Sequence, residues 1–148
     1  MSKPPKEYDE GPLIERVMAY RGRNSRYFNI ARKIAYCSSQ EDYKHGAVLV
    51  KGGSVINTSC NKNRLVSFGS RFCKEHNGTP TLHAELGAIL GIERSITEGA
   101  SIYVCRVGKD GGFRLSKPCS MCHQAMGHVG IKKVYWTIDN YSCAMGKL

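Results

Sequence analysis

Thr81-Leu82-His83-Ala84-Glu85-Leu86 is the stretch around which this chain is organised, and Lys117-Pro118-Cys119-Ser120-Met121-Cys122 is its counterpart downstream. Together they supply one imidazole, one carboxylate two residues later, and two thiols three residues apart. An imidazole and two thiolates are good zinc ligands, and a zinc ion with three protein ligands keeps its fourth position for water. The carboxylate need not bind the metal and can act as general acid and base. We therefore predict one catalytic zinc ion bound by His83, Cys119 and Cys122, with Glu85 as the catalytic residue.

Both stretches lie at the starts of predicted helices. Apolar residues between Leu82 and Leu90 recur at i, i+4, i+7 and i+8, which predicts a helix. Another helix begins near Pro118 or Cys119, because proline suits the first turn. Cys119 and Cys122 then share one face of that turn, where the positive end of the helix favours thiolates. Strands precede both helices, and such positions line the ligand crevice of an open α/β sheet.

The other segments alternate between helical and strand patterns. We expect a helix from Asn24 or Ser25 to about Ser38, a hairpin of residues 47–50 and 55–56 around Gly52-Gly53, a long loop over 61–80, and strands over 101–107 and 133–138. This order predicts an α/β domain whose later strands run parallel, and the ten residues after 138 are too few for another helix-strand unit.

The first 24 residues form a separate region in this interpretation. We expect them to form an N-terminal arm. Within this arm, the spacing of Leu13, Ile14, Val17 and Met18 predicts a short helix. Residues 25–148 then form a single domain. No apolar run approaches the roughly 18 residues of a membrane helix, and the charged N-terminus lacks a signal-peptide pattern. We therefore expect a cytoplasmic protein without a membrane partner.

Composition adds two expectations. The formal net charge of +10 suits a phosphate-bearing substrate and makes nucleic acid a possible partner, although a basic surface also aids solubility. The cysteine count is seven, and two are assigned to zinc. We expect Cys37, Cys60, Cys105 and Cys143 to be reduced thiols, as in a reducing compartment.

From about Tyr27 to Ile138 the sequence resembles the cytidine deaminase superfamily, and most of all its CMP/dCMP-type (deoxycytidylate) branch. The matching segments are HGAVLVKGGSVI (45–56), Asn61, TLHAELGAIL (81–90), SIYVCRV (101–107), SKPCSMC (116–122) and GIKKVYW (130–136). The resemblance implies a three-layer cytidine deaminase-like α/β fold, with a mixed sheet of an N-terminal hairpin then parallel strands, and helices on both faces.

The resemblance also implies roles for single residues. His83, Cys119 and Cys122 match the zinc ligands, and Glu85 matches the proton shuttle. Asn61 matches an asparagine that contacts a sugar hydroxyl, and the backbone amide of Ala84 meets the base carbonyl. The reaction implied is attack of zinc-bound hydroxide on the amine-bearing carbon of cytosine in a nucleotide or nucleoside, above all dCMP to dUMP.

Other interpretations of the sequence stay open. Lys62, Arg64, Arg71, Lys74 and His76 are candidates for a phosphate clamp. The alternative substrate is cytosine or adenine in single-stranded DNA or RNA, including tRNA, with Phe68, Phe72, Phe113 and Trp136 as stacking candidates, although such aromatics more often lie in the core. A third interpretation is a zinc-stabilised binding module without turnover, which leaves Glu85 unexplained.

Two further expectations concern metal count and assembly. Relatives sometimes bind a second zinc in the loop before the His83 helix, and Cys60, Cys73 and His76 are candidate ligands here. We expect no second zinc, because a fourth ligand is missing. Because strand 133–138 would leave a short open edge, we expect a homo-oligomer.

Overall fold

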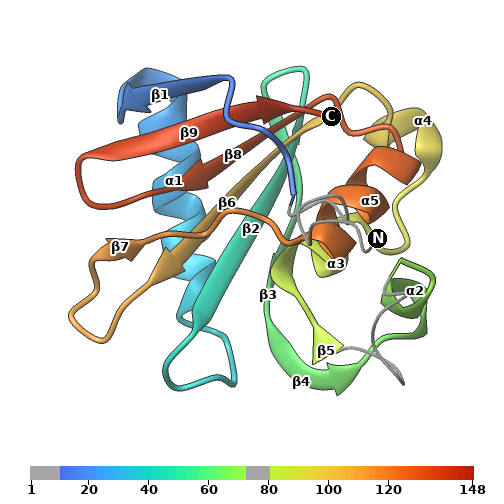
Figure 1. Cartoon of the computed structure of the whole chain (residues 1–148), viewed down its shortest axis with the longest axis horizontal. Coiled ribbons are helices and arrows are strands. Elements are labelled where there is room, and N and C mark those ends of the chain that lie inside the picture. Colours follow the sequence, from blue (N-terminus) through green and yellow to red (C-terminus); the bar gives the residue numbers. More distant parts are fainter. Residues whose placement is uncertain (1–10, 73–80) are drawn as a thin grey trace, which may run out of the picture.

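The computed structural model describes residues 11–72 and 81–148. The strands are β1 (Arg16–Ala19), β2 (Lys44–Lys51), β3 (Ser54–Cys60), β4 (Lys62–Leu65), β5 (Thr81–Leu82), β6 (Ser101–Val107), β7 (Phe113–Arg114), β8 (Lys133–Thr137) and β9 (Ser142–Lys147). The helices are α1 (Gly22–Ala35), α2 (Ser67–Ser70), α3 (Ala84–Ile89), α4 (Arg94–Thr97) and α5 (Ser120–His128). Figure 1 shows their arrangement.

The main sheet is mixed and has seven strands. Its order is β1-β9-β8-β6-β2-β3, with β7 paired to β6, while β4 and β5 form a separate two-stranded sheet. Strand β6 runs parallel to β8, and β2 runs antiparallel to β3 and β6. The predicted hairpin followed by parallel strands is therefore confirmed, and β6 has the predicted bounds.

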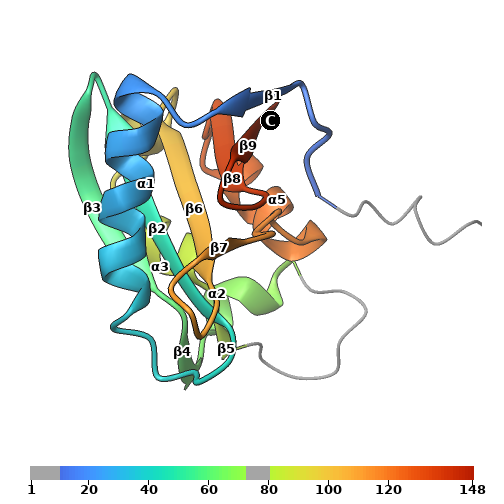
Figure 2. The same ribbon diagram turned by 90° about the vertical axis from the view of Figure 1, so that its left-hand side faces the viewer.

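Helices cover both faces of the main sheet, which gives three layers (Figure 2). Strand β2 is buried from Gly46 to Val50, as expected of a strand covered on both sides. Alternate residues point to opposite faces, so Ala47 and Leu49 pack with α3 and α5, whereas Val48 and Val50 pack with α1. The predicted α/β architecture with helices on both faces is confirmed.

The short helix predicted within the N-terminal arm is wrong. Residues 16–19 form β1, which pairs antiparallel with β9, from Arg16 opposite Met145 to Ala19 opposite Ser142. Leu13, Ile14 and Val17 remain exposed. The apolar spacing looked helical, but pairing with the main chain of β9 determines the structure. The division into an arm over 1–24 and a domain over 25–148 stays a prediction.

The end of the sheet also differs from the expectation. Strand β9 follows β8 through a tight turn and pairs with it, from Thr137 opposite Cys143 to Lys133 opposite Lys147. The edge of β8 is therefore filled within the chain, and the open edge from which we expected a homo-oligomer does not exist. Oligomerisation stays a prediction without that support.

Two smaller expectations concern the loop and the cysteines. The predicted loop over 61–80 contains β4 and α2, and residues 73–80, with the candidate ligands Cys73 and His76, lie outside the described residues. Cys60, Cys105 and Cys143 are buried, Cys37 is exposed, and all four are free thiols as expected. Within the described ranges, no helix has the length and apolarity needed to cross a membrane.

Candidate metal centre and active site

The imidazole of His83 and the thiols of Cys119 and Cys122 lie together, although the sequence separates them. The His83 Nδ1 atom is 3.3 Å from the Cys122 sulfur and 3.8 Å from the Cys119 sulfur. All three ligand atoms lie within 4.8 Å of one another. His83 is the residue before α3 and Cys119 the residue before α5, so the two helices begin side by side at this cluster.

This donor set fits zinc. One nitrogen and two sulfur ligands are typical of zinc sites, and bond lengths of about 2.3 Å to sulfur and about 2.0 Å to nitrogen place tetrahedral N and S ligands about 3.5 Å apart. The observed separations of 3.3 and 3.8 Å bracket that value. The cluster therefore has the donor types and the spacing that a zinc ion with one open position requires.

The position of α3 depends on a close contact with the sheet. Gly87 lies against Ser59 of β3, where a Cβ atom would come within 2.0 Å of the Ser59 Oγ. The Asn57 amide also donates a hydrogen bond to the Ala88 carbonyl, at 3.1 Å. These contacts hold the helix that carries His83 and Glu85 directly on β3.

A buried hydroxyl pair fixes the turn before α5. Ser116 Oγ donates to the Val104 carbonyl at 2.9 Å and accepts from the Thr137 amide at 2.9 Å. Thr137 Oγ1 donates to the Arg114 carbonyl at 2.6 Å. Both side chains are buried, at 3% and 0% exposure. The segment that leads to Cys119 is thus tied to β6 and β8 by the hydrogen bonds of two buried residues.

The carboxyl group of Glu85 is buried beside the cluster, with the residue only 5% exposed. Burial raises the pKa of Glu85, and the positive charge of His83 opposes this shift. A buried carboxyl with a raised pKa can hold and release a proton near neutral pH, as a general acid and base must.

The two thiols differ in their tendency to ionise. Hydrogen bonds from Cys122, and then from His83, lower the pKa of Cys119 to about 4. The pKa of Cys122 is raised, because it donates to the Cys119 sulfur and is buried. The pKa of His83 is raised, mainly by its hydrogen bond with Cys119. The lowered pKa favours the thiolate form of Cys119, and thiolates are the form that binds zinc.

A cavity of about 360 Å³ opens on this cluster, within the size range of small-molecule sites. His83, Glu85 and Cys119 line it, as do Asn61 and Ala84. The structure thus brings together five of the six predicted site residues, and the sixth, Cys122, lies behind them at the cluster. Ala84 is the first residue of α3, and a first-turn amide has no partner within its helix.

The Asn61 side chain braces the cavity wall. Its Oδ1 accepts from the His45 amide at 2.9 Å, and its Nδ2 donates to the Tyr43 carbonyl at 2.6 Å. One N–H of the amide is left for a ligand. The His45 ring lies 3.3 Å from the Tyr43 carbonyl through Nδ1, which can only donate there, so the neutral ring has Nε2 as an acceptor. Burial lowers the pKa of His45, which favours this neutral form.

The predicted phosphate clamp is only partly present at the cavity. Lys62 lines it, and so does Lys117, which sequence reasoning did not select. Arg64 and Arg71 do not line it, and Lys74 and His76 lie outside the described residues. Gln40, Tyr43, His45 and Ser116 also line the cavity and were missed, because only tertiary structure brings them to the motif.

The predicted stacking aromatics lie mostly elsewhere. Trp136 is fully buried and Phe113 is 5% exposed, both in the core. Phe68 and Phe72 pack edge to face with ring centroids 5.4 Å apart, and both are partly buried against the core.

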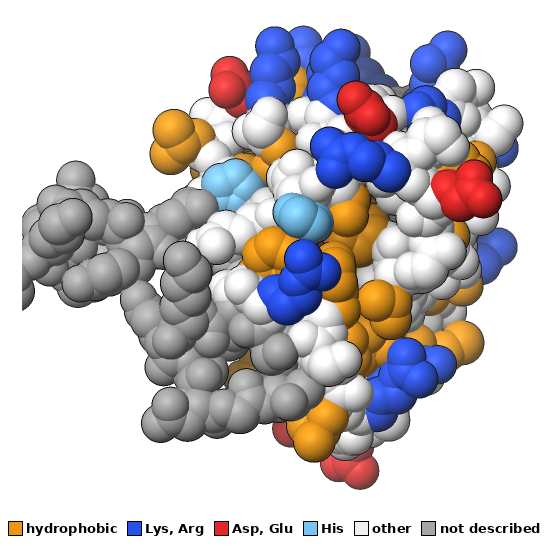
Figure 3. All heavy atoms as spheres, turned by 90° about the vertical axis from the view of Figure 1, so that its right-hand side faces the viewer, with side chains coloured by type: hydrophobic (Ala, Val, Ile, Leu, Met, Phe, Trp, Pro, Cys, Tyr) orange, Lys and Arg blue, Asp and Glu red, His pale blue; other side chains and the backbone are white. Residues whose placement is uncertain are grey.

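Figure 3 shows the face that carries α2, α4 and α5, where Lys and Arg gather along the upper edge with a few carboxylates between them.

Comparisons with known proteins agree with this geometry. The family described as "Cytidine and deoxycytidylate deaminase zinc-binding region" matches residues 22–138. The deoxycytidylate deaminase of Enterobacteria phage T4 is 32% identical over 152 residues, covering 70% of this chain and 74% of the phage protein.

Solved structures of a cyanophage S-TIM5 dCMP deaminase show the same fold. The apo form has a TM-score of 0.54 at 24% identity and covers 77% of this chain and 81% of that one. The complex with dCMP and dUMP has a TM-score of 0.53 at 23% identity, with coverages of 76% and 78%. On the family match and the phage T4 relative, this chain belongs to the cytidine and deoxycytidylate deaminase family and is a zinc-dependent deaminase.

Proposed function

We propose that this chain deaminates a cytosine nucleotide by hydrolysis, converting dCMP to dUMP. The observation that carries the proposal is the buried Glu85 carboxyl beside the His83, Cys119 and Cys122 cluster, at the floor of a cavity of nucleotide size. The name of the phage T4 relative supports deoxycytidylate as the substrate.

In this proposal His83, Cys119 and Cys122 hold the zinc ion. When bound, zinc lowers the pKa of a coordinated water to about 7 and so supplies a nucleophile at neutral pH. Glu85 takes one proton from the attacking water and delivers it to ring nitrogen N3 of cytosine, where it stays in the product. Glu85 then takes the second proton of that water from the new C4 hydroxyl and passes it to the leaving amine, which departs as ammonia while C4 becomes a carbonyl. Burial of Glu85 suits this work, because a carboxylate with a raised pKa is a stronger base than a carboxylate in water and so accepts a proton from the water more readily.

Other cavity residues orient the substrate. The unpaired amide of Ala84 donates to the base carbonyl, and the free N–H of Asn61 donates to a sugar hydroxyl. The neutral His45 ring offers Nε2 as an acceptor for a second hydroxyl. Lys62 and Lys117 supply positive charge for the phosphate.

Glu85→Gln tests the proposed mechanism. The amide fits the same space but cannot carry a proton, so we expect turnover to fall by roughly 10²–10⁴-fold or more. Zinc should remain at one ion per chain by elemental analysis, because Glu85 is no ligand. The matched control is Glu41→Gln on the exposed surface, which should keep wild-type activity. A Glu85→Gln enzyme with most of its activity would contradict the mechanism.

The substrate is tested by ammonia release from dCMP, CMP, cytidine, adenosine and a single-stranded oligonucleotide. We expect the highest kcat/KM with dCMP. The net charge of +10 is the observation that favours a nucleic-acid substrate instead. Faster release from the oligonucleotide, falling steeply between 50 and 200 mM salt through counterion release, would favour that alternative.

A further inference from the structure

A second cavity lies away from the candidate active site. It has a volume of about 290 Å³ and is formed by the start of α1, the β2–β3 turn, and the starts of β6 and β8. Along β2 the candidate active site is at His45 and this cavity is at Val50, about 17 Å further at 3.4 Å per residue. His45 and Val50 also point to opposite faces of the sheet. The two cavities are therefore separate.

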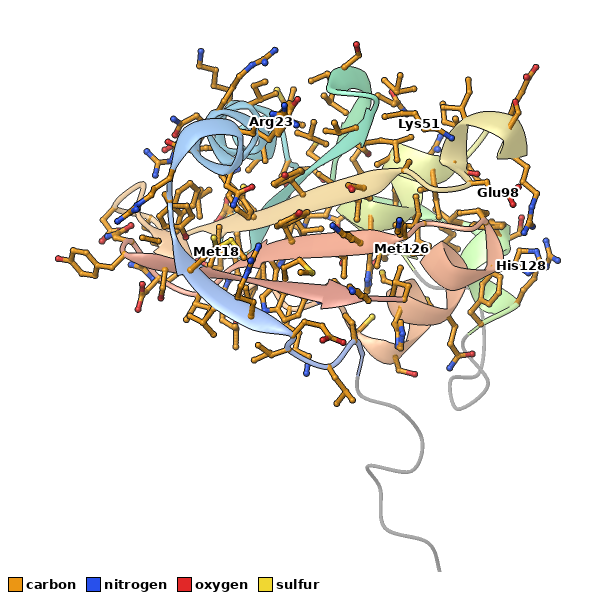
Figure 4. All side chains as sticks on the ribbon, turned by 90° about the horizontal axis from the view of Figure 1, so that it is seen from above. Met18, Arg23, Lys51, Glu98, Met126 and His128 are labelled. Atoms are coloured by element: carbon orange, nitrogen blue, oxygen red, sulfur yellow. The ribbon has the colours of Figure 1, made fainter. Side chains whose placement is uncertain are left out.

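Three cations from three different elements line this second cavity. They are Arg23 of α1, Lys51 of β2 and Lys133 of β8, and the lining contains no carboxylate. Figure 4 labels Arg23 on α1 and Lys51 near Glu98, which follows α4. Like charges around one cavity repel one another, and an anion bound among them would turn this repulsion into attraction.

The cations are not neutralised by nearby acids. The three ion pairs among the described residues join Arg94 to Glu98, Lys109 to Asp42 and Arg114 to Asp110, so none involves the cavity. Lys51 donates to the carbonyls of Ser95 and Glu98, which orients its ammonium group without cancelling the charge. Arg23 and Lys133 have no such contact within the described part of the chain.

The wall between the cations is a rigid group of tyrosines. Tyr103 and Tyr135 stack with ring centroids 4.3 Å apart and planes at 3°, and Tyr27 lies 5.0 Å from Tyr103. Tyr27 donates to the Gly53 carbonyl at 2.7 Å, and Tyr103 donates to Asn24 Oδ1 at 3.0 Å. Because these bonds tie α1 to the β2–β3 turn and to β6, the cavity is formed before any ligand binds.

We propose that this cavity is a binding site for a small phosphate-bearing anion, held by Arg23 and Lys133 with Lys51 as a fixed third charge. Arginine and lysine are the side chains that bind phosphate oxygens with charge-assisted hydrogen bonds. The tyrosine wall offers an apolar surface for an organic group attached to the phosphate. Binding here requires no catalysis, so the proposal is independent of the substrate assigned to the other cavity.

The test is isothermal titration of the zinc-loaded protein with inorganic phosphate, pyrophosphate and phenyl phosphate. We expect saturable binding of pyrophosphate that weakens at least tenfold in the double variant Arg23→Gln/Lys133→Gln. Lys51 is left unchanged because its contacts support the α4 segment. Tighter binding of phenyl phosphate than of inorganic phosphate would identify an organic phosphate as the ligand, and the reverse order an inorganic one. Both results support the site.

Two variants with the same change in charge serve as controls. Lys33→Gln/Lys132→Gln removes two exposed charges outside the cavity and should leave pyrophosphate binding unchanged. Lys62→Gln/Lys117→Gln removes the charges at the other cavity. Absence of saturable binding, equal weakening by the Lys33/Lys132 pair, or loss only with the Lys62/Lys117 pair would each overturn the proposal. Ammonia release by Arg23→Gln/Lys133→Gln should match wild type, which also shows that this variant is folded.

Discussion

Gly11 contacts the turn that carries the first cysteine of the cluster. Its φ angle is +108°, and a Cβ atom there would come within 2.1 Å of the Pro118 carbonyl oxygen. An alanine must therefore displace either the arm or the main chain directly before Cys119, since neither contacting atom belongs to a flexible side chain.

Gly11→Ala is expected to weaken zinc retention and reduce turnover through the shift of Cys119. Competition with a chromogenic chelator measures the zinc affinity, and ammonia release measures turnover. Gly91→Ala is the control, since Gly91 has a φ of +78° but no atom within 4 Å of the added Cβ. If both variants behave alike, backbone strain alone explains the effect and the contact with Pro118 has no role.

The candidate site shows what single residues reveal before a structure is known. His83, Cys119 and Cys122 could be chosen because their side chains and spacing already specify metal chemistry. The wall residues Tyr43 and His45 could not be chosen, because a tyrosine and a histidine outside any motif have many ordinary roles. Asn61 was selected by resemblance, but its bonds to the backbone of residues 43 and 45 depend on how β2 and β3 lie together.

At the scale of elements, Ser116 joins the turn before α5 to two strands. Ser116→Ala leaves the Val104 carbonyl and the Thr137 amide without this buried partner, which costs about 1–3 kcal/mol of folding free energy. We expect a lower midpoint in urea unfolding and a lower kcat, because the turn also positions Cys119. Ser95→Ala, on the exposed surface, should change neither quantity. An unaltered urea midpoint would show that water replaces the lost hydroxyl.

The turn between β8 and β9 depends on Asp139. Its Oδ1 accepts from the amides of Tyr141 and Ser142, both at 2.8 Å, and from the Ser142 hydroxyl at 3.0 Å. These bonds, the Tyr141 amide first, lower the pKa of Asp139 below its ordinary 3.8. A carboxyl group with a lowered pKa in the folded state stabilises the protein above pH 3.8 and loses this effect as pH falls through the folded pKa.

Asp139→Ala should therefore lower the melting temperature at neutral pH. The difference from wild type should shrink as the pH is lowered below about 3.8. Asp139→Asn keeps an acceptor oxygen without the charge, so its smaller deficit should vary less with pH. Differential scanning fluorimetry between pH 7 and 3 measures all three proteins. A deficit for alanine that is constant over this range would exclude the ionised carboxylate as its source.

The elements differ in how far the sequence predicts them. Ser101–Val107 could be predicted to the residue, because β-branched and aromatic residues form a buried run between turns. Ser142–Lys147 has small residues and one glycine and carries no such pattern, yet it forms β9 because β8 and β1 provide partners on both sides. Arg16–Ala19 is a strand for the same reason. Strands that are specified by their neighbours cannot be found from local periodicity.

At the scale of the whole molecule, zinc is expected to couple the site to stability. The ligands come from two helices that only the folded chain brings together, so a metal that binds this state raises the melting temperature. Protein treated with a chelator should melt at a lower temperature and lose activity, and one equivalent of Zn²⁺ should restore both. Mg²⁺ should restore neither, since it prefers oxygen ligands. Two tightly bound zinc ions per chain would contradict the single site that we expect.

The pairing of β1 with β9 has a consequence for the order of folding. Ala19 lies opposite Ser142, so this ladder joins segments from near the two ends of the described chain. Closing so large a loop costs conformational entropy, and only four residue pairs form in return. The β2–β3 hairpin closes across two glycines, so its loop-closure entropy is much smaller and it can form early. We expect β1 to dock last, after β2, β3, β6 and β8 have assembled. Until then the edge of β9 is open to other chains, and the newly made protein is most prone to aggregate during that interval.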